Sequence, residues 1–117
     1  MVMLNTGLNR IRDLVNADID KGQVGINGTV ALASNTGLTS PISSTLLSTT
    51  NTISDKQLNL KYTLLSTQGE TNTLKEFELT SSTSSTSYDR IVFTGVSFTL
   101  NGSEDLIISK RYFFRGL

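Results

Sequence analysis

The sequence predicts a mainly β protein: a small antiparallel β-sandwich with one short N-terminal helix and an extended arm. Apolar and polar residues alternate repeatedly after position 57, Ser and Thr are abundant, and only one segment has helical spacing. At 117 residues there is room for one core. We therefore expect a single domain over 1–117, with the helix and arm in about 1–55 and the β-sandwich core in about 56–117.

The helix is predicted near the N-terminus, where apolar residues recur every three or four positions: Leu8, Ile11, Leu14, Val15 and Ile19. We expect it to run roughly from Leu8 to Asn16, with Asn5 or Thr6 as its cap. A helix this short is not stable alone, so its apolar stripe must dock on a sheet or on a partner.

The segment after the helix is rich in glycine and reaches Pro41, which indicates an extended, loop-rich stretch. We expect at most one short strand there, at Thr29–Ala33. Residues 39–55 are rich in Ser and Thr but retain apolar side chains such as Ile42 and Ile53. They are therefore interpreted as an extended edge segment rather than as disorder.

The second half predicts a series of strands. Residues 58–64 alternate as in a half-buried strand, 67–72 form a hairpin loop, and 75–79 return beside the first strand. Residues 80–87 form a low-complexity loop, and a third strand follows from Arg90, with a bulge at Gly95 and a turn at Asn101-Gly102. The last strand, Leu106–Phe114, has two apolar faces, so we expect burial on both sides, by the domain interior or by an oligomer partner.

The absence of His and Cys removes most routes to catalysis at neutral pH. No Ser-His-Asp or Cys-His arrangement and no ordinary zinc site can form, and no catalytic or cofactor-binding residue is identified. Residues 16–22 imitate the start of a calcium loop, but Lys21 stands where the turn glycine belongs. We therefore expect no metal, no cofactor and no enzymatic activity.

Three close carboxylate pairs remain: Asp18 with Asp20, Glu76 with Glu78, and Glu104 with Asp105. Such pairs can serve glycoside hydrolysis, but charged patterns usually mark exposed faces, so a solvated position is favoured for all three. No apolar run is long enough for a membrane helix, and the first residues lack the features of a signal peptide. We expect no membrane partner and synthesis in the cytoplasm.

Basic and aromatic residues are interleaved at the C-terminus, in the order Lys110, Arg111, Tyr112, Phe113, Phe114 and Arg115. This pattern can bind single-stranded nucleic acid. The ten basic and ten acidic residues cancel, however, so a core strand or a subunit contact is favoured over a nucleic-acid partner.

The order of several short motifs resembles a family of small virion structural proteins of tailed viruses, of the tail-fibre or head-decoration type. The motifs are a GLN-x-IRDL helix at Gly7–Leu14, a G-x-GT stretch at Gly25–Thr29, Thr36-Gly37-Leu38, Glu76–Leu79, Arg90–Phe93 and an acidic turn before Leu106–Ile108. The resemblance implies a non-enzymatic particle component without catalytic residues.

The resemblance further implies a protein made in the host cytoplasm that ends in the virion, at the tail (fibre, baseplate or adaptor) or on the capsid. Its partners would be copies of itself and other virion proteins, tail or major capsid. The candidate subunit contacts are apolar residues of the helix and the last strand: Leu8, Ile11, Leu14, Val15, Tyr112, Phe113 and Phe114. An intramolecular core position is an equal alternative for them.

The second hypothesis is a receptor- or glycan-binding module at a fibre tip. In that case the Ser/Thr/Asn-rich loops at 43–52 and 80–87 would bind a host surface glycan.

Overall fold

The computed structural model describes residues 4–65, 73–93, 98–99 and 105–114. In chain order its elements are the helix α1 (Asn5–Asp18), β1 (Lys21–Gly25), the 3-10 turn η1 (Ser43–Thr45), β2 (Leu47–Ser48), β3 (Thr50–Ser54), β4 (Gln57–Leu64), β5 (Thr73–Leu74), β6 (Glu76–Thr80), β7 (Ser87–Val92), β8 (Phe98–Thr99) and β9 (Leu106–Phe113). The predicted loop at 67–72, the bulge at Gly95 and the turn at Asn101-Gly102 lie outside the described residues.

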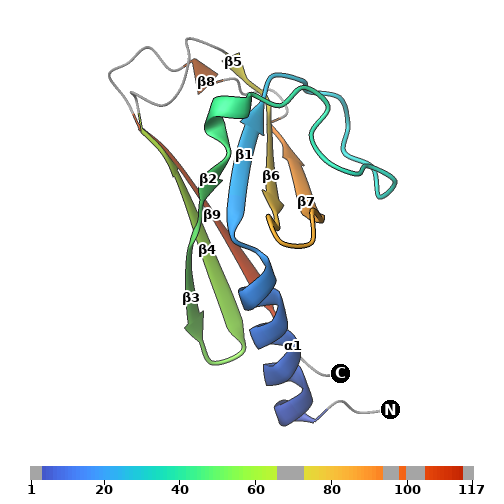
Figure 1. Ribbon diagram of the computed structural model, residues 1–117, viewed down its shortest axis with the longest axis vertical. Coiled ribbons are helices and arrows are strands. Elements are labelled where there is room, and N and C mark those ends of the chain that lie inside the picture. The colour runs from blue at the N-terminus through green and yellow to red at the C-terminus, as the bar shows by residue number, and fades with distance from the viewer. Residues whose placement is uncertain (1–3, 66–72, 94–97, 100–104, 115–117) are drawn as a thin grey trace.

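The strands form antiparallel sheets that pack face to face (Figure 1). Sheet A has the order β2-β1-β6-β7, sheet B has the order β3-β4-β9, and β5 pairs with β8. The molecule is elongated, with extents of 48 × 27 × 27 Å. The predicted class, a small β-sandwich with one N-terminal α-helix, is confirmed.

Strand β4 supplies the centre of the core. Its burial alternates as its sequence does: Leu58, Leu60, Tyr62 and Leu64 are all at most 2% exposed. The intervening residues face outward, because successive side chains of a strand point to opposite faces. The predicted strand at 58–64 is therefore confirmed.

The partner predicted for β4 was wrong. β6 does not return beside β4; it lies in the other sheet, between β1 and β7. The two strands face each other across the core, where the rings of Tyr62 and Phe77 lie 5.1 Å apart. Alternation identified both strands, but it cannot distinguish a strand that is hydrogen-bonded from one that is stacked.

Strand β1 was missed because its glycines indicated a loop. A Cβ at Gly22 would lie 2.5 Å from Cδ2 of Tyr62, and one at Gly25 would lie 2.5 Å from both Oε2 of Glu76 and the carbonyl of Ser40. Both glycines therefore permit close packing inside a strand. Thr29–Ala33, where at most one short strand was expected, form a loop.

The helix is longer than expected at both ends. Leu4 occupies the N-cap with no side-chain bond, so the predicted cap at Asn5 or Thr6 was wrong. α1 lies beside the lower part of β4 (Figure 1). At its C-terminus the amide of Asn51 donates to the carbonyls of Asn16 and Ile19, which no helical N–H can reach.

The segment at 39–55 contains edge strands, as expected. β2 is the edge of sheet A and β3 is the edge of sheet B, with Thr49 between them. A two-residue turn at Asp55-Lys56 then leads into β4, and Asp55 has a φ of 52°, a region that Asp tolerates better than most residues.

Strand β7 begins at Ser87, before the predicted Arg90, and a register shift occurs opposite it, between Leu79 and Thr80. The last strand, β9, alternates half-buried and exposed residues. Ile107 is 55% exposed and Phe113 is 48% exposed. The domain interior therefore does not cover the second face of β9, and an oligomer partner stays a prediction.

Candidate functional site

A loop of residues 26–40, the arm loop, projects from the upper part of the molecule beside β7 (Figure 1). Its two ends are joined by an antiparallel bridge between Gly25 and Pro41 and by the bond from Ile26 N to Ser40 O. A closed loop of this length is an Ω-loop, a type that is often functional. The arm loop is therefore the first candidate site.

The carboxylate of Glu76, the first residue of β6, holds the base of the arm loop. Backbone N–H groups donate to it from Asn27 at 3.1 Å, Thr39 at 2.9 Å and Ser40 at 2.9 Å. Burial by itself raises the pKa of Glu76, but these bonds and the one from Arg90 outweigh it, so the pKa lies below its ordinary value. The carboxylate is therefore ionised and bound from both sides of the loop.

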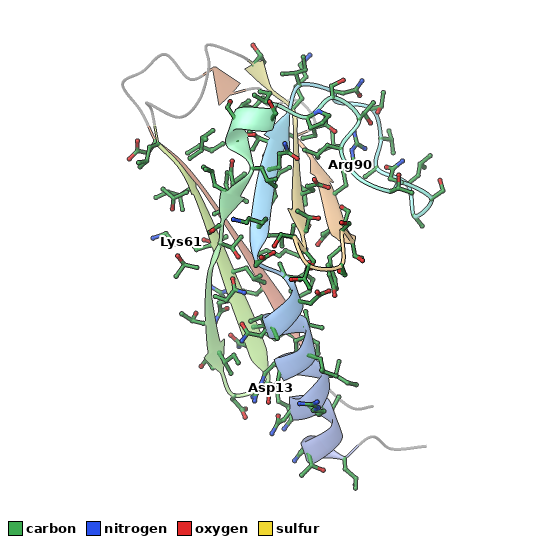
Figure 2. All side chains as sticks on the ribbon, in the orientation of Figure 1. Asp13, Lys61 and Arg90 are labelled. Atoms are coloured by element: carbon green, nitrogen blue, oxygen red, sulfur yellow. The ribbon has the colours of Figure 1, made fainter. Side chains whose placement is uncertain are left out.

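Arg90 of β7 also holds the arm loop, and we call Glu76 and Arg90 together the anchor. Its Nε lies 3.0 Å from Oε1 of Glu76, and the two side chains are 4% and 0% exposed. Its Nη1 donates to Thr29 O and to Asn35 Oδ1, and its Nη2 donates to Asn27 O and to Thr29 Oγ1. All five guanidinium donors thus have acceptors, four of them in the arm loop. Figure 2 shows Arg90 between β7 and the loop.

The tip of the arm loop is apolar. Val30 is 74% exposed and Leu32 is 62% exposed. Asn35 fixes the turn that follows, since its Oδ1 accepts from Leu32 N and its own N–H donates to Leu32 O. The buried ion pair therefore supports a loop that presents two aliphatic side chains to solvent.

The predicted solvated position of Glu76 and Glu78 was wrong. Both lie on the outer face of sheet A, beneath the arm loop, where Glu78 is 7% exposed and accepts from Ser87 Oγ at 2.7 Å. The arm loop covers a strand face that would otherwise be exposed to water. The sequence did carry a signal, since a hairpin of β6 and β7 places Arg90 on the face of these two carboxylates.

The acidic pair at the C-terminal end of the helix, Asp18 and Asp20, is bound by the serine-rich loop. Ser81 and Ser84 donate to Asp18, and so does the hydroxyl of Tyr88. These hydrogen bonds lower the pKa of Asp18, and the one from Tyr88 contributes most to the shift.

Asp20 is held in the same way, because Ser82 donates to it through its hydroxyl and its N–H, which lowers the pKa of Asp20. The loop predicted at 80–87 spans residues 81–86, between β6 and β7, and its hydroxyls at 81, 82 and 84 are engaged within the molecule. They therefore make a weaker glycan site than the sequence suggested.

The structure divides the candidate helix contacts into two groups. Leu8 is buried and Val15 packs against the core, so these two serve the fold. Ile11 is 39% exposed and Leu14 is 51% exposed, and their spacing of three residues places them on one side of the helix. We call Ile11 and Leu14 the helix flank.

The candidate contacts on the last strand are also divided. Tyr112 and Phe114 pack against the core, and the hydroxyl of Tyr112 donates to Asp89 at 3.0 Å. Lys110 pairs with the same Asp89 at 3.3 Å, whereas Phe113 points to the opposite, exposed face. The basic and aromatic residues at 110–114 therefore do not form one surface, and Arg115 lies outside the described residues.

Within the described part of the chain, no three His, Cys, Asp or Glu residues are grouped so that they could hold a metal ion. The helix that the structure describes lacks the length and apolarity needed to cross a membrane. Comparison of the chain with protein-family models, with curated proteins and with solved structures finds no match.

Proposed function

We propose that this chain is a non-enzymatic structural component of a tailed-virus virion, of the tail or of the capsid surface, which associates with copies of itself and docks on neighbouring virion proteins. The observation that carries the proposal is the anchored arm loop. Burying an ion pair seldom increases stability over an apolar alternative, and its best-attested use is to fix one conformation. Here it fixes a loop with an apolar tip.

The motif segments that resemble virion proteins converge on this anchor. Glu76 and Arg90 each begin one of these segments, and they bind the backbone of Asn27 and Thr29 in a third. Gly37, in a fourth, lies against Glu78, where a Cβ would be 3.4 Å from Oε2. Four of the motif segments of this chain thus meet where the arm loop is held, which supports an assembly role.

The contact between copies would be heterologous, because the arm-loop tip and the helix flank are different surfaces that lie apart. The arm-loop tip belongs to the upper half of the molecule, and the helix flank belongs to its lower end (Figure 1). A tip that packs on the helix flank of the next copy gives a ring when the rotation closes, or a filament when it does not.

The test uses two half-defective variants. Val30→Ser with Leu32→Ser removes the tip, and Ile11→Ser with Leu14→Ser removes the helix flank. Wild-type protein should form oligomers at tens of micromolar in size-exclusion chromatography with light scattering, and each variant should be monomeric. An equimolar mixture of the two variants should form a dimer, because one intact tip meets one intact flank.

A matched control replaces two exposed apolar residues outside both surfaces and outside β9, Leu46→Ser with Ile53→Ser, and should assemble as the wild type does. A wild-type protein that stays monomeric, or variants that stay monomeric when mixed, would contradict the heterologous contact. Phe113→Ser tests the remaining candidate contact on β9. The virion assignment itself is tested by mass spectrometry of purified particles, in which the protein should be present in stoichiometric amounts.

A further inference from the structure

The outer face of sheet B carries three rows of side chains that point away from the core. The register aligns Thr52 with Asn59 and Arg111, and Thr50 with Lys61 and Ser109. The third row joins Ser54, Gln57 and Phe113. Figure 2 shows Lys61 projecting away from sheet A.

All residues of these rows except Phe113 line a shallow depression of about 500 Å³. A second hollow of about 240 Å³ adjoins it and shares Ser54 and Gln57, with Phe113 on its wall. Together they fall in the size range of small-ligand sites. The surface therefore has room for an oligosaccharide of a few units.

The charge of this face has one sign. Lys61 and Arg111 are diagonal neighbours on adjacent strands, and neither makes an ion pair within the described residues. No carboxylate stands in the three rows; Asp55 and Asp105 lie beyond their two ends. By contrast, Arg12, Arg90 and Lys110 each face a carboxylate. The face is therefore complementary to an anion.

The remaining groups match sugars. Hydroxyls and amides donate and accept hydrogen bonds in the same small area, as the alcohols of a saccharide require. Phe113 offers an exposed ring at one end on which the apolar face of a sugar can lie. A nucleic acid would need more stacking rings and a longer basic groove.

We propose that the outer face of sheet B binds an anionic oligosaccharide, with Lys61 and Arg111 holding its carboxylate or sulfate groups and Asn59, Gln57 and Thr50 holding its hydroxyls. This inference goes beyond the assembly role and does not rest on it, because the face is separate from the arm loop and from the helix flank. A monomeric protein could still bind the sugar, and an assembled one could fail to bind it.

The experiment is isothermal titration of the intact chain with oligogalacturonate as the carboxylate probe, a heparin oligosaccharide as the sulfate probe and a maltooligosaccharide of equal length as the neutral probe. We expect one anionic probe to bind at least tenfold more tightly than the neutral one. Lys61→Gln with Arg111→Gln should weaken that binding by about tenfold or more, as expected for the loss of two charge-assisted contacts.

The matched control is Arg10→Gln with Lys75→Gln, which removes the same charge from exposed positions elsewhere and should change the affinity less than twofold. Unchanged circular dichroism and thermal melting of both pairs establish that folding is intact. Absence of binding to both anionic probes, equal weakening by the control pair, or equally tight binding of a poly-glutamate peptide would each overturn the proposal. The last outcome would assign the face to acidic proteins instead.

Discussion

Sheet B and the outer face of sheet A are organised by different chemistry. In sheet B the alternation of β4 alone decides which side chains are buried, and its opposite face stays in water. In sheet A both faces of β6 are covered, because Glu76 and Glu78 lie beneath the arm loop while Phe77 and Leu79 lie in the core. Apolar burial needs only a surface, whereas a buried charge needs every partner in place. The arm loop should therefore be the more specific of the two regions and also the more fragile.

The largest effect is expected at the anchor. Arg90→Met leaves the Glu76 carboxylate buried without its counter-charge, which should lower the free energy of unfolding by about 3–5 kcal/mol in urea denaturation. Adding Glu76→Gln should restore part of this loss, because the amide still accepts a hydrogen bond and carries no charge. A double variant as unstable as the single one would show that the ion pair is not the source of the effect.

A core truncation in sheet B should lower the free energy of unfolding slightly less than the change at the anchor does. Leu60→Ala removes a side chain that is 2% exposed, and we expect a loss of about 3 kcal/mol with no change in the arm loop. Ile107→Ala on the other face of the same sheet should change stability by less than about 0.5 kcal/mol. Similar losses at the two positions would mean that the outer face of sheet B is covered.

Acidification should destabilise sheet A and the C-terminal end of the helix before it destabilises sheet B. The folded-state pKa values of Glu76, Asp18 and Asp20 are all lowered, so the unfolded chain binds more protons at acid pH. Their contribution is complete above the unfolded pKa values of about 4 and is lost as the pH falls through the lowered folded values. The free energy of unfolding should thus be flat near neutrality and should fall below about pH 4–5.

The variant Glu76→Gln distinguishes the contribution of Glu76 to the pH dependence from that of Asp18 and Asp20. This variant should show a shallower decline of stability with falling pH than the wild type, and Asp18→Asn with Asp20→Asn should remove the rest. An unchanged pH profile for Glu76→Gln would contradict the lowered pKa of the buried carboxylate.

The smallest effect is expected in the serine-rich loop. Ser81→Ala removes the hydroxyl that donates to Asp18 and accepts from Thr83 N and Ser84 N, and the loss should be about 1 kcal/mol in the same urea measurement. Ser85→Ala, at an exposed position with a φ of 55°, provides the control for any change at the loop tip. Equal effects would indicate a backbone cause rather than the lost hydroxyl.

The sequence predicted well those elements whose burial follows from local pattern. β4 and the amphipathic helix were identified from the spacing of their apolar residues. The edge segments at 39–55 were identified from the apolar side chains retained in a Ser/Thr-rich stretch. The pairing of the strands could not be predicted from the spacing of apolar residues. Strand β6 pairs with β1 and β7, and β1 was missed because its glycines, Gly22 and Gly25, which leave room for Tyr62 and Glu76, indicated a loop.

The candidate site was found only in part. Ile11 and Leu14 were named from the helical stripe and are exposed, while Leu8 and Val15 of the same stripe are covered by the fold. The arm loop was missed as a site because charged residues in a strand usually indicate exposure, and Arg90 reaches Glu76 only once the hairpin has formed. Val30 and Leu32 alone gave no sign that they lie at a fixed tip.

Amide hydrogen exchange tests the anchored arm loop most directly. The N–H groups of Asn27, Thr39 and Ser40 donate to Glu76, so they should be protected in the wild type and should exchange much faster in Arg90→Met, while the amides of β4 keep their protection. Exchange of these three amides at unprotected rates in the wild-type protein would contradict a loop held in one conformation by the buried ion pair.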